Sequence, residues 1–126
     1  MAEFIETPLK YVLGTDDGWD FTIYTSKQRV QIRDTAGFTL NFMVKRQKSD
    51  LDAAALYSTT ATITGTYHSD PAVNTQVAQV TIADTDLPAT TTTAGSVHWE
   101  LKRMDAGHEG IGAAGRMTLI RPVHDA

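Results

Sequence analysis

The sequence has no cysteine and no long apolar run. The lack of cysteine excludes disulfides, thiolate metal ligands and cysteine nucleophiles, and it leaves the redox compartment open. No stretch approaches the roughly 18 apolar residues of a membrane-spanning helix, and no basic-then-apolar secretion signal is present. We therefore expect no membrane partner. The 126 residues have room for one domain with one core.

An excess of positive charge is also missing. Lys and Arg total 11 against 15 Asp and Glu, for a net charge of -4, whereas a nucleic-acid-binding domain normally has a basic face and a high pI. The short basic cluster Lys45-Arg46-Gln47-Lys48 has no interleaved aromatic residue, and we interpret it as a solvated strand end rather than a phosphate site. The sequence thus predicts no nucleic-acid partner.

The clearest pattern that is present is alternation of apolar and polar residues, which is typical of half-buried strands. From Phe38 to Val44 every second residue is apolar and is expected to face inward, while Lys45 is expected to face outward. Nineteen threonines support a β-rich chain, because β-branched residues favour pleated surfaces. The same pattern predicts further strands at residues 19–23, 30–32, 62–67, 78–82, 97–102 and 117–120.

Many short strands separated by Gly, Asp and Pro turns predict an all-β sandwich or barrel. Only residues 50–56 favour a helix, of about two turns, with Asp50 as its N-cap. A fold of alternating strands and helices needs several longer helices than this.

Residues 1–18 differ from the rest, since their apolar residues follow no clean period. We predict an N-terminal arm over 1–18 and a β-sandwich domain over 19–126. Such an arm is ordered only where its own core or a neighbouring chain holds it, and extended it would reach about 60 Å. The residues expected to bind a partner are Phe4, Ile5, Leu9, Tyr11 and Leu13.

One motif suggests a nucleotide site. Residues 110–115 match G-x-G-x-x-G, which binds a pyrophosphate only between a strand and a helix. Only 11 residues follow Gly115, too few for the helix, second strand and ribose-binding acid that this site needs. We interpret the motif as a flexible loop before the last strand.

The remaining polar residues predict no catalytic centre. His98 and Glu100 share one strand face, and with the following His108-Glu109 they would form at most a weak surface cation site, the alternative being solvated side chains. Asp16-Asp17 and Asp84-Thr85-Asp86 are interpreted as turn caps, and no serine lies in a nucleophile-elbow pattern. We expect no catalytic, metal-binding or cofactor-binding residue, no small-molecule substrate and no enzyme activity.

The aromatic residues leave a binding role open. Trp99 is expected to pack in the core, with ligand stacking as the alternative. The four tyrosines are expected to divide between the edge of the core and contacts with other proteins. They are Tyr11, Tyr24, Tyr57 and Tyr67.

The order of several segments resembles that of the small immunoglobulin-like β-sandwich proteins of tailed bacteriophages. The resemblance covers roughly residues 30–121, and its most specific piece is W-E-L-K-R-x-D-A-G at 99–107. The chain departs from the simplest pattern in its arm and in the loop Ala89–Ala94. The segments concerned are 34–46, 64–67, 78–86, 95–107 and 115–119.

This resemblance implies an immunoglobulin-like antiparallel β-sandwich and a non-enzymatic virion role. The favoured role is a capsid decoration (cement) protein, made in the cytoplasm of a bacterial host, that bridges major capsid subunits on the capsid surface. A homo-oligomer is expected, with a trimer favoured. The arm would clamp a neighbour by β-augmentation or by burying its apolar residues. The alternatives are a tail or baseplate adaptor that anchors a receptor-binding protein through tail proteins, and a carbohydrate-binding module.

Overall fold

The computed structural model describes residues 5–6, 8–24, 32–105, 107 and 110–122, and almost all of its regular structure is β-strand. One short 3-10 helix, η1 (Asp52–Ala54), interrupts the strands. The strands are β1 (Ile5–Glu6), β2 (Leu9–Val12), β3 (Asp17–Phe21), β4 (Leu40–Lys45), β5 (Tyr57–Thr60), β6 (Thr62–Thr64), β7 (Val77–Ile82), β8 (Gly95–Arg103) and β9 (Gly110–Ile120).

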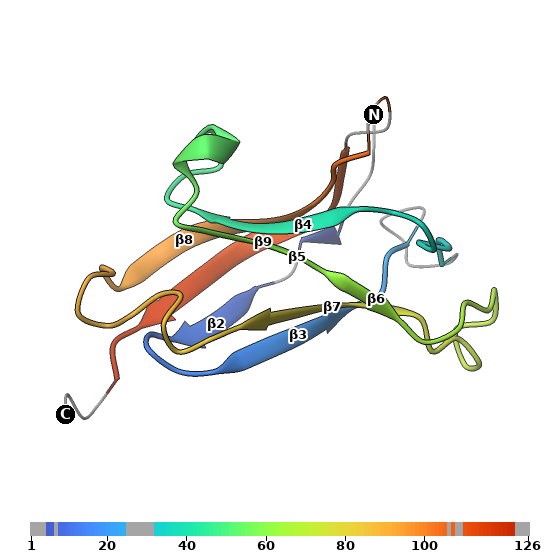
Figure 1. Cartoon of the computed structure of the whole chain (residues 1–126), viewed down its shortest axis with the longest axis horizontal. Helices are drawn as coiled ribbons and strands as arrows, with labels where there is room; N and C mark the ends of the chain where they lie inside the picture. The colour runs from blue at the N-terminus through green and yellow to red at the C-terminus, as the bar shows by residue number, and fades with distance from the viewer. Residues whose placement is uncertain (1–4, 7, 25–31, 106, 108–109, 123–126) are drawn as a thin grey trace.

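The described strands form two sheets that face each other across the core (Figure 1). The larger has the order β1-β9-β8-β4-β5, with β2 also pairing β9, and the smaller has the order β3-β7-β6. This is the immunoglobulin-like arrangement, in which β9, β8 and β4 correspond to strands G, F and C, β5 to the added C′ strand, and β3, β7 and β6 to B, E and D. The predicted all-β sandwich is confirmed. It is not wholly antiparallel, because β1 and β2 run parallel to β9.

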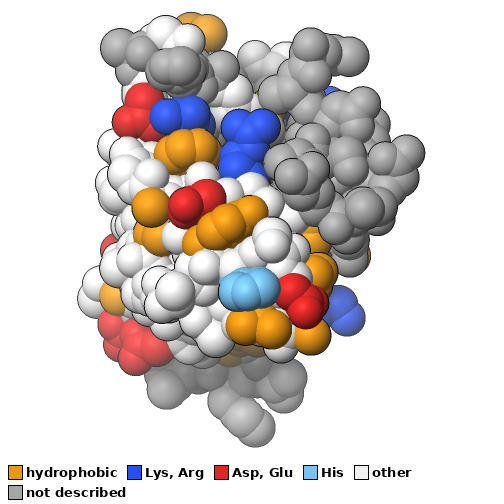
Figure 2. All heavy atoms as spheres, turned by 90° about the vertical axis from the view of Figure 1, so that its right-hand side faces the viewer, with side chains coloured by type: hydrophobic (Ala, Val, Ile, Leu, Met, Phe, Trp, Pro, Cys, Tyr) orange, Lys and Arg blue, Asp and Glu red, His pale blue; other side chains and the backbone are white. Residues whose placement is uncertain are grey.

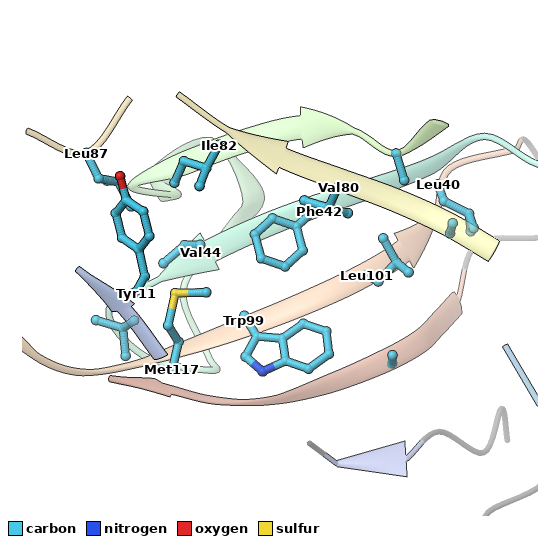
Figure 3. Packing of buried hydrophobic residues seen from close by; sticks show 14 of the residues in the cluster. Tyr11, Leu40, Phe42, Val44, Val80, Ile82, Leu87, Trp99, Leu101 and Met117 are labelled. Atoms are coloured by element: carbon cyan, nitrogen blue, oxygen red, sulfur yellow. The ribbon is translucent and has the colours of Figure 1, made fainter. Parts of the chain in front are cut away.

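The core follows from the alternation along the strands. Phe42 and Val44 of β4 and Trp99 and Leu101 of β8 are fully buried and point at the small sheet (Figure 3), and Leu40 and Val97 of the same strands also belong to the core. Phe42 stacks between Trp19 and Trp99, with ring centroids 5.8 Å away on each side. The strongest sequence pattern therefore marks the face that folding buries.

Most predicted strands are present with shifted ends. The predictions at 78–82 and 97–102 lie within β7 and β8, and the one at 117–120 is the second half of the longer β9. The prediction at 62–67 is too long, because Gly65 adopts φ +80° and turns the chain after Thr64. Residues 30–31 lie outside the described part, and Ile32 bridges Tyr24.

The helix predicted over 50–56 is wrong. A single 3-10 turn forms, its N-cap is Leu51 with an extended ψ of 153°, and no side chain caps it. Tyr57–Thr60 instead pairs with β4 as β5, so the chain has to return to the sheet after one turn.

The flexible loop predicted for residues 110–115 is also wrong, because they form the first half of β9. Gly115 lies opposite Trp99 and Ala113 opposite Leu101, so small residues leave room beside the two large inward side chains. Within the described residues no helix follows this motif, so the geometry of a dinucleotide site does not form.

The separate N-terminal arm and the boundary after residue 18 are a further correction. β2 pairs with β9 from Leu9 opposite Met117 to Val12 opposite Ile120, so this segment is a strand of the sandwich itself. Tyr11 is 1% and Leu13 2% exposed in the core of their own chain, so both are wrong as partner-binding residues. The physical reason is that an unpaired apolar strand is stabilised most by the nearest open sheet edge, here β9.

Three other residues were expected to bind a partner. Leu9 is half-buried and packs against the core. Ile5 pairs with Ala113 through the backbone, and Phe4 lies outside the described residues.

Candidate interaction surfaces

The outer face of the large sheet contains a compact cluster of charges. Lys45 was expected to be exposed, but its exposed fraction is only 4%. Its Nζ lies 2.8 Å from Asp52 Oδ1 and also contacts Glu100, while Lys102 Nζ lies 3.0 Å from Asp52 Oδ2. Asp52 of η1 thus joins lysines from β4 and β8, and this clip holds η1 against the sheet.

The electrostatics of this cluster favour the ionised forms. Burial by itself would lower the pKa of Lys45, but the hydrogen bonds to Asp52 and Glu100 outweigh it and raise the pKa. The hydrogen bonds from Lys45 and then Lys102 lower the pKa of Asp52. Each charge therefore has a partner of opposite sign, which is the arrangement of a structural ion cluster rather than of a reactive acid or base.

The predicted acidic turn caps are confirmed for Asp16, Asp17 and Asp86. Asp86 accepts a hydrogen bond from the Ala83 N–H at 2.8 Å, and Asp16 accepts one from the Asp84 N–H at 2.8 Å. Asp17 accepts one from the N–H of Gly18 at 2.7 Å. These carboxylates satisfy turn backbone groups.

The weak cation site considered around His98, which was the less favoured interpretation, is not assembled in the described part of the chain. Glu100 contacts Lys45, and His108 and Glu109 lie outside the described residues. No group of three metal-ligating side chains gathers within those residues.

The aromatic residues are committed to packing and hydrogen bonds. Trp99 is fully buried, so the core role is confirmed and ligand stacking by this ring is wrong. The hydroxyl groups of Tyr11, Tyr57 and Tyr67 donate to the carbonyls of Thr15, Thr81 and Ile32 at 2.6, 3.1 and 3.2 Å. The structure therefore does not provide a Trp99 platform for the carbohydrate-binding alternative, which had Trp99 or the tyrosines as its stacking residues.

One side of the sandwich is an open edge of both sheets. The segment Tyr57–Thr64, which we call the open rim, forms β5 at the edge of one sheet and β6 at the edge of the other (Figure 1). The chain crosses between the sheets at Ala61, whose N–H donates to the Leu40 carbonyl at 2.8 Å. In the described structure β5 pairs only with β4 and β6 only with β7.

The open rim lacks the usual protection of a sheet edge. Its sequence YSTTATIT has no charged residue and no proline, whereas exposed edges are normally protected by Lys, Pro or bulges. Ser58, Thr60, Thr62 and Thr64 are exposed along it. The strand at 57–60 was not predicted from the sequence, although its β-branched residues were a signal for it. The rim is suited to accept a strand from another chain.

A second surface is a basic hollow on the outer face of the large sheet, with a volume of about 330 Å³. Arg46 is held at the edge of the hollow by a hydrogen bond from its Nη1 to the Thr93 carbonyl, 3.1 Å long. Arg46 and Lys48 are exposed, as expected of a solvated strand end. The hollow is lined by Arg46, Gln47, Lys48, Ser96, Val97, His98, Gly115 and Arg116.

The end of the molecule on the right of Figure 1 has a mixed surface. Figure 2 shows that the described hydrophobic side chains there form small patches between polar and charged ones. Such scattered apolar groups are ordinary for a protein surface and do not mark a docking face.

The comparisons with known proteins add no assignment to these surfaces. No described helix is long and apolar enough to cross a membrane. No model of a known protein family matches the sequence, and a search of curated proteins finds no significant match.

Proposed function

We propose that this protein is a non-enzymatic structural component of a tailed-phage virion. Its favoured role is that of a capsid decoration protein, which bridges major capsid subunits from the outside of the shell and self-associates, with a trimer as the favoured oligomer. The open rim is the observation that carries this proposal, because an unprotected edge shared by two sheets is a surface made for contact with another chain.

In this proposal the open rim, rather than the N-terminal segment, contacts the neighbouring subunits. The apolar residues Tyr11 and Leu13 stabilise the chain's own core, so the contact with neighbours has to come from another surface. Backbone groups along Tyr57–Thr64 would pair with a strand of a neighbouring subunit. Many such modest contacts, repeated over a closed shell, would stabilise it by mass action.

The proposal is tested on purified particles. We expect this chain to be present in hundreds of copies per particle, and particles that lack it to lose resistance to heat and osmotic shock. A few to a few dozen copies would instead favour the tail or baseplate adaptor. Absence from the particle, or particles equally robust without it, would overturn the decoration role.

The role of the rim is tested with two added charges. Ser58→Lys with Thr60→Lys places lysines on exposed positions of the edge strand, and we expect attachment to particles to fall at least tenfold. Thr81→Lys is the control, because Thr81 is exposed on the central strand β7 of the smaller sheet, away from an edge. Equal attachment of both variants would show that the rim is not the contact.

A further inference from the structure

We infer that the basic hollow binds the carboxylates of an acidic segment on a partner protein. The inference rests on the proposed function, in which that partner is a neighbour in the assembly, and it concerns a different surface from the open rim. Three observations carry it: the charge of the lining, the register of the strands below it, and the fixed position of Arg46.

The lining of the hollow is basic in a chain that is acidic overall. Arg46, Lys48 and Arg116 line it, and no carboxylate is among the described residues that do so, although the chain has a net charge of -4. The hollow is therefore a local site of positive potential that attracts anions.

The strand register places Arg116 in one row with Lys45, and His98 lies between them. His98 of β8 lies opposite Lys45 of β4 on one side and opposite Arg116 of β9 on the other. Glu100 and Asp52 compensate Lys45 inside the sheet face, whereas an anion for Arg116 has to come from outside the lining.

Arg46 completes the site from the opposite side. Its hydrogen bond to the Thr93 carbonyl fixes the guanidinium at the edge of the hollow. This bond uses one of the five N–H donors of the guanidinium. The remaining donors suit the two oxygens of a carboxylate. The threonine-rich loop 89–94 thus gains a role, since it orients this arginine before a ligand arrives.

The arrangement favours an acidic segment over a single small anion. The cations are spread over the loop that follows β4 and over strand β9, around an open hollow of about 330 Å³. Exposed ion pairs are individually weak, so one phosphate that meets one or two of these side chains would bind poorly. A segment with several carboxylates would contact Arg46, Lys48 and Arg116 together, and linking these contacts raises the affinity.

A titration followed by NMR tests the inference on the full chain. The probes are a hexaglutamate peptide and inorganic phosphate, compared at equal charge concentration and equal ionic strength. We expect the peptide to shift the amide signals of Ser96, His98 and Arg116, and its affinity to fall as salt is added. Arg46→Gln with Arg116→Gln should weaken peptide binding at least tenfold.

The matched control is Arg33→Gln, which removes one exposed positive charge outside the hollow and should change the affinity less than twofold. Because the substituted arginines are exposed, the variants should keep a dispersed spectrum. The inference is overturned if the peptide gives no shifts, if the double variant binds as tightly as the parent, or if phosphate gives the same shifts at the same charge concentration.

Particle attachment separates this inference from the proposed function. If the parent chain attaches to particles and the arginine double variant attaches less, both are supported. If both attach equally, the role of the hollow in assembly fails while the decoration role stands. If the parent chain does not attach, the proposed function fails, and so does the assembly partner assigned to the hollow.

Discussion

The rings of Phe21 and Trp99 meet between the two sheets, with their centroids 5.0 Å apart. Phe21 belongs to β3 and Trp99 to β8, which correspond to the B and F strands that a disulfide joins in antibody domains. This chain has no cysteine. An aromatic contact therefore links the two sheets at the place where antibody domains use a covalent bond.

Loss of this contact should be costly. We expect Trp99→Ala to lower the free energy of unfolding by about 3–5 kcal/mol, because it leaves a cavity in a fully buried position. Trp99→Phe, which keeps an aromatic ring, should lose less. When Trp99→Ala is combined with Phe21→Ala, the loss of unfolding free energy in the double variant should differ from the sum of the two single losses by about 0.5–1.5 kcal/mol, as measured by urea unfolding. Strict additivity would mean that the rings do not stabilise each other.

The buried pair of Lys45 and Glu100 gives a second prediction. Lys45→Met should lower the free energy of unfolding by about 3–5 kcal/mol, because it leaves Glu100 buried without its cation. The double variant Lys45→Met with Glu100→Leu should recover most of this loss. Lys102→Met is the control at a more exposed position and should lose at most about 1 kcal/mol. A double variant less stable than Lys45→Met would contradict this account.

The stability of the η1 clip should depend on pH through Asp52. The pKa of this carboxyl is lowered in the folded chain, first by the hydrogen bond from Lys45 and then by that from Lys102. The unfolded chain therefore binds the proton more readily, so the contribution is complete above the unfolded pKa of about 3.9 and is lost as pH falls through the folded value.

Asp52→Asn isolates this contribution. We expect the variant to be less stable than the parent at pH 7 and to approach it as the pH falls below about 3.9. Asp20→Asn, at an exposed position on β3, is the control for the loss of one negative charge. Chemical denaturation at several pH values measures both. A stability difference that does not change with pH would rule out the ionic clip.

Two glycines with nearly equal φ angles allow the cost of a strained backbone to be measured separately from the cost of steric crowding. Gly37 has φ +81° and Gly65 φ +80°, and a Cβ at Gly37 would meet nothing within 4 Å, whereas one at Gly65 would lie 2.1 Å from the Thr75 carbonyl oxygen. Gly37→Ala should lose about 1–2 kcal/mol from the left-handed backbone alone. Gly65→Ala should lose about 1–3 kcal/mol more from overpacking in the β6–β7 hairpin. Equal losses in thermal unfolding would show that the hairpin relaxes freely.

The sequence could predict the parts of the fold that local pattern controls. The alternation around Phe42, Val80 and Trp99 located the inward face of three strands, since burial on one face leaves a period of two. It did not locate the buried Lys45, because its partners Asp52 and Glu100 are far enough along the chain that only the folded sheet brings all three together.

The pairing of β2 with β9 was harder to predict from the sequence. Tyr11 and Leu13 have an irregular pattern because β2 lies at an edge and its partner is more than 100 residues away. The basic hollow also escaped prediction as a unit. Arg46 and Arg116 become neighbours only through the pairing of β4, β8 and β9.

The parallel pairing of β2 with β9 has a consequence for how the protein acquires its structure. Leu9 meets Met117 only after nearly the whole chain has been made, so Tyr11 and Leu13 remain exposed to water until the final strand arrives. Such distant pairings slow folding, and all-β domains of this kind typically fold in milliseconds to seconds. During synthesis the nascent chain would therefore be an incomplete sandwich with exposed apolar side chains. A chaperone that shields the first fifteen residues should raise the yield of native protein.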